Sequence, residues 1–296
     1  MTVITAPDTT DRVLAGILLT SIAYFLFSTQ DAAIKLLVAG ISVWQIMLFR
    51  SLVILGSCLA IGGPQLFVDS ARSPIVKPML LRSFIILAAW LCYYTAAKDL
   101  QLAELTTIYF AAPVIVTVLS IPLLGEKVPL IRWIAVLTGF LGVYIACDPT
   151  NLGFSTPILL VLAAATLWAT SVVLLRKTAL QERTIIQLVL NNGFFLIVSI
   201  IPLTMLWTTP SLFELALLVS VGALGGLAQY ALFEGMKRAP VSVIAPFEYT
   251  SLIWAFGLGY AIWGDFPRDA VFYGAAFIIG AGLIILASER FKRRTA

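Results

Sequence analysis

The chain has 296 residues, of which 60% are hydrophobic and 11% are charged. An average soluble domain has roughly 25% charged residues, so this composition excludes a water-soluble fold and predicts an integral membrane protein. There is no histidine, which removes the commonest metal ligand and the usual general base near neutral pH. We therefore expect no metal and no cofactor.

Residues 1–11 are polar and acidic, and they precede the first apolar run. They lack the basic start of a signal peptide, and no small-residue cleavage site follows a short apolar core. The helix that begins at Val13 is therefore expected to be retained. The cysteines Cys58, Cys92 and Cys147 lie scattered in or beside apolar runs, so no disulfide framework is expected.

The apolar runs and their breaks predict ten transmembrane helices, each close to the roughly 20 residues that a bilayer span requires. In chain order they are Val13–Val38, Ser42–Ile61, Met79–Ala97, Leu102–Leu124, Leu130–Ala146, Pro157–Leu175, Thr184–Trp207, Leu212–Gly235, Val241–Trp263 and Asp269–Ser288. Turn-forming runs such as Gly62-Gly63-Pro64 join them.

The basic residues of the predicted loops indicate the orientation of the helices. With the N-terminus in the cytoplasm, Lys98 and Arg268 lie in outside loops, and Lys35 and Arg50 lie within spans. Fifteen other basic residues lie in inside segments: Arg12, Arg72, Lys77, Arg82, Lys127, Arg132, Arg176, Lys177, Arg183, Lys237, Arg238, Arg290, Lys292, Arg293 and Arg294. This bias predicts two cytoplasmic termini. The same bias explains the basic C-terminus as an anchor that fixes the topology. No nucleic acid is therefore expected as a partner.

The two halves of the sequence resemble each other. The fourth predicted helix ends at Gly125-Glu126 and the ninth at Gly264-Asp265, and a proline and an apolar helix follow each site. Because five is an odd number, the second half enters the membrane from the opposite side. Inverted repeats of this kind are typical of transporters, whose site lies between the halves. The sequence thus predicts an all-α polytopic protein, with residues 1–150 and 151–296 as inverted five-helix repeats around a central cavity. The alternative is that two apolar halves look alike by composition alone.

Motifs in both halves resemble a known family. They are Ala111-Ala112-Pro113, Leu123-Leu124-Gly125-Glu126-Lys127, Ala245-Pro246-Phe247-Glu248-Tyr249-Thr250 and Ile262-Trp263-Gly264-Asp265. On them the chain is identified as a member of the drug/metabolite transporter superfamily, in its EamA-type branch. The resemblance covers nearly the whole chain and implies a ten-helix basket in the cell inner membrane. Within the branch the chain most resembles bacterial exporters of amino acids, including aromatic ones. Asp265 stands where the branch usually has Glu.

Charged side chains inside a span are costly, roughly 2.5–3.5 kcal/mol each at the bilayer centre, so each requires a reason. Asp31 and Lys35 are four residues apart. They are candidates for gating or coupling, and the alternatives are a local ion pair or a Lys35 side chain that reaches the interface. Arg50 has no partner within four residues of its own helix. We predict that Arg50 faces the cavity and holds a substrate carboxylate by a two-point fork.

Two prolines interrupt the hydrogen bonding of predicted helices. Pro113 frees the carbonyl of Tyr109, and Pro246 frees that of Ser242, so both prolines are candidates for gating. Glu248 follows Pro246 closely. A carboxylate beside a kink is suited to bind a substrate ammonium or to carry a proton, and the sequence does not choose between these roles.

Aromatic residues are the next candidates for the substrate site. Tyr94, Trp168, Tyr249 and Trp254 lie mid-span or in the segments that carry the repeat, and we predict that they line one cavity. Aromatic walls suit a substrate with a flat apolar part, and equally a substrate ammonium. The alternative for Trp168 is packing in the core or against lipid.

These features predict a secondary transporter that works by alternating access on a small-molecule substrate, as a monomer or homodimer in the lipid bilayer. The favoured substrate is an amino acid, and the alternatives are a sugar, a nucleotide-sugar or a drug-like compound. No ATP-binding loop pattern occurs, so no nucleotide drive is expected. A membrane enzyme would need a cluster of nucleophile, base or metal ligands, and a channel would need a repeated ring or filter. Neither is expected.

Overall fold

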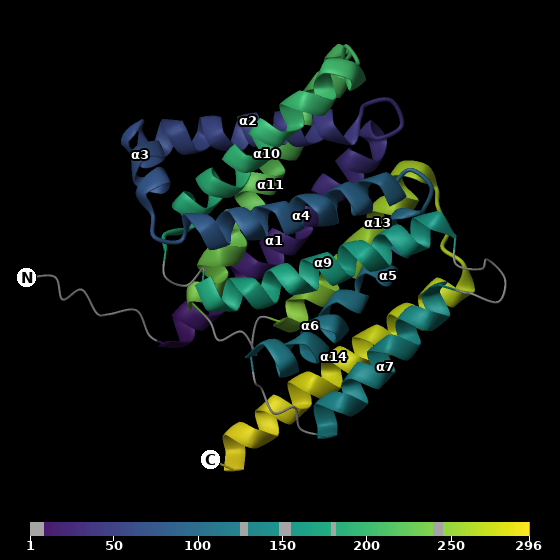
Figure 1. Cartoon of the computed structure of the whole chain (residues 1–296). Helices are drawn as coiled ribbons and strands as arrows, with labels where there is room; N and C mark the ends of the chain where they lie inside the picture. Colours follow the sequence, from purple (N-terminus) through teal and green to yellow (C-terminus); the bar gives the residue numbers. More distant parts are fainter. Residues whose placement is uncertain (1–8, 125–129, 148–154, 179–181, 239–244, 296) are drawn as a thin grey trace, which may run out of the picture.

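The structure is a computed structural model that describes residues 9–124, 130–147, 155–178, 182–238 and 245–295. This part of the chain is built from helices, without strands (Figure 1). They are α1 (Thr9–Leu37), α2 (Val43–Gly62), α3 (Gln65–Arg72), α4 (Val76–Ala96), α5 (Leu102–Tyr109), α6 (Ala111–Leu124), α7 (Leu130–Cys147), α9 (Thr156–Thr178), α10 (Thr184–Leu206), α11 (Leu212–Arg238), the 3₁₀ helix η2 (Ala245–Tyr249), α13 (Thr250–Trp263) and α14 (Asp269–Thr295).

The described helices agree with the ten predicted spans in number and order. Within these residues α1, α2, α4, α10 and α11 are each long and apolar enough to cross a membrane by themselves. The helices α7, α9 and α14 contain shorter apolar stretches. The two other spans are each made of two pieces, α5 with α6 and η2 with α13. The chain is thus a polytopic helical membrane protein.

The packing of the helices shows the relation between the two halves. The first span of one half packs against the third span of the other, α1 on α11 and α9 on α4. The two second spans, α2 and α10, pack together, and so do the two fifth spans, α7 and α14 (Figure 1). Each contact therefore has a counterpart in the other half, as expected for two inverted repeats. The predicted boundary between residues 150 and 151 lies outside the described residues.

The fourth span of each half is broken at the same place. The helix α5 ends at Tyr109 and η2 ends at Tyr249, in both cases next to the start of the following helix. Pro113 lies in the first turn of α6, where the missing N–H of a proline is tolerated. The ring of Phe110 stacks on that of Tyr249, with centroids 5.3 Å apart and planes 21° apart, so the two breaks face each other. Broken helices are tolerated in a membrane where they line a cavity.

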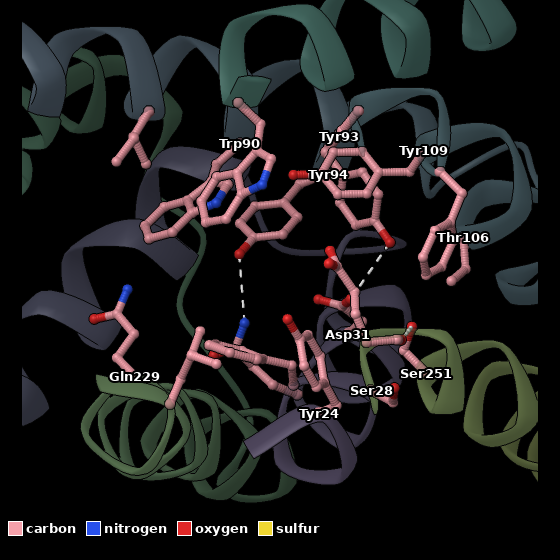
Figure 2. A pocket seen from close by; sticks show the side chains of 18 of the residues that line it. Tyr24, Ser28, Asp31, Trp90, Tyr93, Tyr94, Thr106, Tyr109, Gln229 and Ser251 are labelled. Atoms are coloured by element: carbon pink, nitrogen blue, oxygen red, sulfur yellow. Dashed lines mark hydrogen bonds between the residues drawn. The ribbon is translucent and has the colours of Figure 1, made fainter. Parts of the chain in front are cut away.

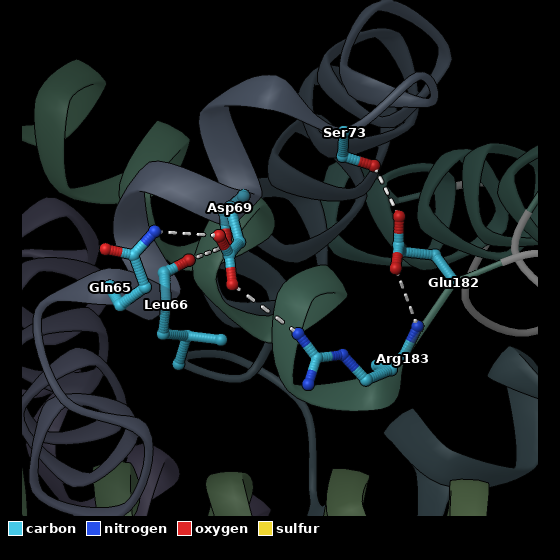
Figure 3. Close-up of polar contacts among 7 residues, drawn as sticks. Gln65, Leu66, Asp69, Ser73, Glu182 and Arg183 are labelled. Carbon is cyan, nitrogen blue, oxygen red and sulfur yellow. Dashed lines mark hydrogen bonds and ion pairs between the residues drawn. The ribbon is translucent and has the colours of Figure 1, made fainter.

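A short helix, α3, lies where a simple loop was expected between the second and third spans. Gly63 precedes it with a φ of 66°, a left-handed conformation that ends α2 and turns the chain. The hydroxyl of Ser73, just after α3, donates to Glu182 at 2.6 Å, and Arg183 lies 3.7 Å from Asp69 (Figure 3). These contacts attach α3 to the segment that leads into α10, so they join the two halves at this end of the molecule.

Candidate functional site

A cavity of about 230 Å³ lies between the two halves, enclosed by helices of both. Most of its wall is apolar or aromatic, and Figure 2 shows the side chains that surround it. Its charged lining residues are two arginines and two carboxylates: Asp31 of α1, Arg50 of α2, Arg82 of α4 and Glu248 of η2. Three of these are predicted site residues, and the cavity brings them together from distant parts of the sequence.

Arg50 is the most deeply buried cation of the described residues, with an exposed fraction of 0%. Its guanidinium carbon lies 4.0 Å from the centre of the Trp90 ring. None of its three guanidinium nitrogens has a hydrogen-bond partner in the described part of the chain. A buried charge without hydrogen bonds is costly, so Arg50 is suited to receive an anionic group from a bound molecule.

Arg82 is a site residue that the sequence interpretation missed. It was assigned to a cytoplasmic loop, but it lies in the second turn of α4 and is only 7% exposed. It lines the cavity, and its Nε has no hydrogen-bond partner among the described residues. The sequence contained a sign of this role, because Arg82 lies three residues inside a predicted span, where a charged side chain is costly unless it has a partner or a function.

Asp31 and Lys35 do not form the ion pair that their spacing allows. The Asp31 carboxylate accepts a hydrogen bond from the Tyr93 hydroxyl at 3.3 Å (Figure 2). Lys35 instead donates to the carbonyl oxygens of Ala97, at 3.2 Å, and of Leu100. Carbonyls that follow the end of a helix lack partners and carry partial negative charge, which explains this choice. Asp31 therefore lines the cavity, and Lys35 ties α1 to the segment that follows α4.

Three of the aromatic residues that line the cavity come from α4. Trp90 and Tyr94 stack with their ring centroids 6.4 Å apart, and Tyr93 meets Tyr109 of α5 edge to face at 5.0 Å (Figure 2). Rings on α4 are presented along one face because they are spaced three and four residues apart. Trp168 of α9 also lines the cavity, as predicted.

Tyr249 and Trp254, two predicted aromatic site residues, are not in the cavity wall. Tyr249 lies behind Phe110, against which it stacks, and so supports the wall from outside. Trp254 is 38% exposed and packs edge-on against Phe25 on the outer face of the bundle. The expectation that Trp254 lines the cavity is therefore wrong. Its helix is apolar on every side, so its position in the middle of the span gave no information on the direction of the ring.

Glu248 lies at the break of the second-half fourth span and faces the cavity. In the described part of the chain its carboxylate has no hydrogen-bond donor, whereas its backbone carbonyl accepts from the Ser251 hydroxyl at 2.8 Å. Pro113 also lines the cavity, at the corresponding break of the first half. Pro246 lies in η2, but its side chain is outside the described residues. Pro113 and Glu248 thus bring both interrupted spans to the cavity. The predicted release of the Ser242 carbonyl by Pro246 lies outside the described residues.

One face of α1 contributes further residues that were not selected from the sequence. Tyr24, Phe27 and Ser28 line the cavity beside the predicted residue Asp31. The four residues follow one another at intervals of three, one and three residues, so they lie on one face of the helix. This spacing was a signal that could have identified Ser28 as a cavity residue.

Comparison with known proteins supports the same architecture. A model of the EamA-like transporter family matches residues 14–147 and again residues 155–287. The chain is 28% identical over 281 residues to the S-adenosylmethionine uptake transporter of Rickettsia conorii, which covers 92% of this chain and 94% of the relative. It is 28% identical over 222 residues to the riboflavin transporter of Vibrio cholerae, over 73% of each chain. It is 24% identical over 291 residues to the pseudopaline exporter CntI of Pseudomonas aeruginosa, over 95% of this chain and 99% of the relative.

Proposed function

The chain belongs to the EamA-like transporter family, and we propose that its substrate is a small zwitterion with a flat apolar part. The family and the relatives support transport of a small metabolite across a membrane. The narrower substrate class is inferred from the cavity. We further propose that the protein works by alternating access in the cell inner membrane, with both termini in the cytoplasm.

The observation that carries this proposal is that Arg50 is a buried cation without hydrogen-bond partners among the described residues. Its guanidinium is fully buried, lies over the Trp90 ring and has three nitrogens without partners among the described residues. A guanidinium held in one plane offers two parallel N–H bonds that match a carboxylate. A substrate carboxylate would therefore satisfy the group that the folded protein leaves without hydrogen bonds.

The remaining lining residues support the cationic and apolar parts of the substrate. Asp31 and Glu248 provide two carboxylates for an ammonium group. The rings of Trp90, Tyr94 and Trp168 provide flat surfaces for an apolar or aromatic portion. Such a cavity fits an α-amino acid with a large side chain, and it equally fits S-adenosylmethionine, which has an amino-acid group and a purine ring.

The names of the relatives affect which substrates we propose. None of the three is named as an exporter of amino acids, which the sequence resemblance favoured, and they are named for both uptake and export. The S-adenosylmethionine relative is similar to this chain over nearly the whole length of both. S-Adenosylmethionine is therefore included among the proposed substrates beside aromatic amino acids. Riboflavin is a weaker candidate because it has no carboxylate for Arg50.

Transport into proteoliposomes tests the proposal. The purified protein is reconstituted, and uptake is measured for S-adenosylmethionine, phenylalanine, tryptophan, riboflavin and glucose. We expect saturable uptake of at least one carboxylate zwitterion, inhibited by its unlabelled form and absent from protein-free vesicles. Saturable uptake of glucose or riboflavin alone would contradict the proposed substrate class.

A further inference from the structure

The cavity contains a second buried guanidinium, that of Arg82, which the proposed function does not use. We propose that Arg82 is a second recognition residue, and that the preferred substrate is two-headed. One head is the carboxylate bound by Arg50, and the other is an acceptor group, a carboxylate or a heterocycle edge, bound by Arg82. This inference rests on the proposed function and narrows its substrate class.

Among the described residues, no ion pair accounts for the burial of Arg82. It is 7% exposed, and no carboxylate lies within ion-pair distance of it in the described part of the chain. Its neighbour Ser83 is already occupied, because its hydroxyl donates to Asn191 or to the Met79 carbonyl, each at 2.8 Å. The Nε of Arg82 is without a hydrogen bond. Arg82 therefore resembles Arg50 in being a buried cation that faces the cavity.

The two guanidinium groups belong to different regions of the cavity. Arg50 lies against Trp90, and Arg82 precedes Trp90 by eight residues on α4. Eight residues of α-helix span about 12 Å along the axis. Helical side chains lean toward the N-terminus of their own helix, and α2 and α4 run in opposite directions. Arg50 therefore leans toward one end of the molecule and Arg82 toward the other.

This separation determines what a substrate must provide. A free α-amino acid has one carboxylate, and that group cannot contact both arginines at once. A longer molecule with acceptors on the order of 10 Å apart can contact both and lie along the rings between them. S-Adenosylmethionine has this form, with a carboxylate at one end and purine nitrogens at the other. A dipeptide whose N-terminal residue has a carboxylate side chain, such as glutamyl-methionine, has it too.

Selectivity between one-headed and two-headed substrates tests the inference. Half-saturation concentrations for uptake or for competition are measured for methionine, S-adenosylmethionine, S-adenosylhomocysteine and the dipeptide glutamyl-methionine, with the parent protein, Arg82→Gln and Arg82→Lys. The control is Arg72→Gln, because Arg72 is exposed at the end of α3 and does not line the cavity. S-Adenosylmethionine differs from methionine in its adenosyl group and in the positive charge of its sulfonium, and S-adenosylhomocysteine, which lacks that charge, separates the two effects. Comparison of S-adenosylmethionine with glutamyl-methionine distinguishes a heterocycle edge from a second carboxylate.

We expect the parent to favour one of the two-headed compounds over methionine by about tenfold or more, the usual gain from a charge-assisted hydrogen bond. Arg82→Gln should remove that preference and change the value for methionine less than about twofold, within the effect of a weak contact. Arg82→Lys, which keeps the charge and the fold, should lose part of the preference. Equal changes for all compounds, or a parent without preference, would overturn the inference. Absence of saturable uptake of every compound by the parent would instead contradict the proposed function.

Discussion

The guanidinium carbon of Arg50 lies 4.0 Å from the centre of the Trp90 ring, so a cation on α2 lies over an aromatic ring on α4. Interactions of this kind contribute about 2 kcal/mol when both groups are desolvated. The ring contact holds the guanidinium in place, while its three nitrogens have no hydrogen-bond partner among the described residues. Arg50 is thus positioned before a substrate arrives, which favours tight binding of a carboxylate.

The first prediction concerns the shape of the Arg50 side chain. Arg50→Lys keeps a positive charge but loses the planar two-point fork and the stacking on Trp90. We expect the half-saturation concentration for a carboxylate substrate to rise about tenfold or more, with a smaller change in maximal rate. Transport at limiting substrate equal to that of the parent would show that the fork does not bind the substrate. Arg72→Lys serves as the control, because Arg72 is exposed at the end of α3 and does not line the cavity.

The second prediction concerns Gly225 of α11, which lies against Arg50. A Cβ on Gly225 would be 2.9 Å from the Nε of Arg50 and closer still to the amide oxygen of Gln30. Gly225→Ala should therefore displace both side chains, lower stability by about 1–3 kcal/mol and weaken substrate binding. Gly257→Ala is the matched control, because nothing lies within 4 Å of the added carbon. Thermal unfolding and uptake measure the two effects. Equal behaviour of the two variants would contradict the close packing described here.

The third prediction concerns Glu248 at the helix break. A carboxyl group that faces the cavity is able to take up a proton on one side of the membrane and release it on the other. We expect Glu248→Gln to lose uptake driven by a pH gradient and to keep exchange of internal for external substrate. A parallel loss of both activities would indicate substrate binding instead. Unchanged activities would make Glu248 structural. Glu234→Gln is the control, since that carboxylate pairs with Arg238 at 2.6 Å.

The fourth prediction concerns the closure of one end of the cavity. Glu104 of α5 is bound to Arg268, just before α14, at 2.8 Å, and so joins the two halves. Separation of the halves at this end must break that ion pair. Glu104→Gln should therefore increase labelling of a cysteine placed at Tyr94 by a thiol reagent added from this side. The exchanged pair Glu104→Arg with Arg268→Glu should restore the parental rate. No difference in labelling would show that the pair does not control access.

The fifth prediction concerns topology. The bias of basic residues predicts ten spans with both termini in the cytoplasm. Single cysteines at Asn151, which is outside the described residues, and at Lys177 of α9 should be accessible from opposite sides of the membrane. Labelling of intact cells with an impermeant reagent should modify the Asn151 position alone. Modification of both positions from one side would contradict the predicted orientation.

The sequence by itself determined the spans and their order. Lipid tolerates few charges and requires long apolar runs, so these runs and their polar breaks are visible without any structure. The approximate bounds of the spans, a disturbance of the helices near Pro113 and Pro246, and the unusual position of Arg50 could be predicted in this way, whereas α3 and the extension of α14 to Thr295 could not. Each of these predictions depends on local chemistry that lies within a few residues of the site.

The tertiary structure alone decided which side chains share the cavity. It brought Arg82 into the wall, gave Lys35 carbonyl partners in place of Asp31, and directed Trp254 outward. Sequence could not separate these cases because a helix that faces lipid on one side and packed apolar residues on the other is apolar all round. Its composition therefore does not mark the inner face. Only the packing of the helices against one another determines which residues reach the cavity.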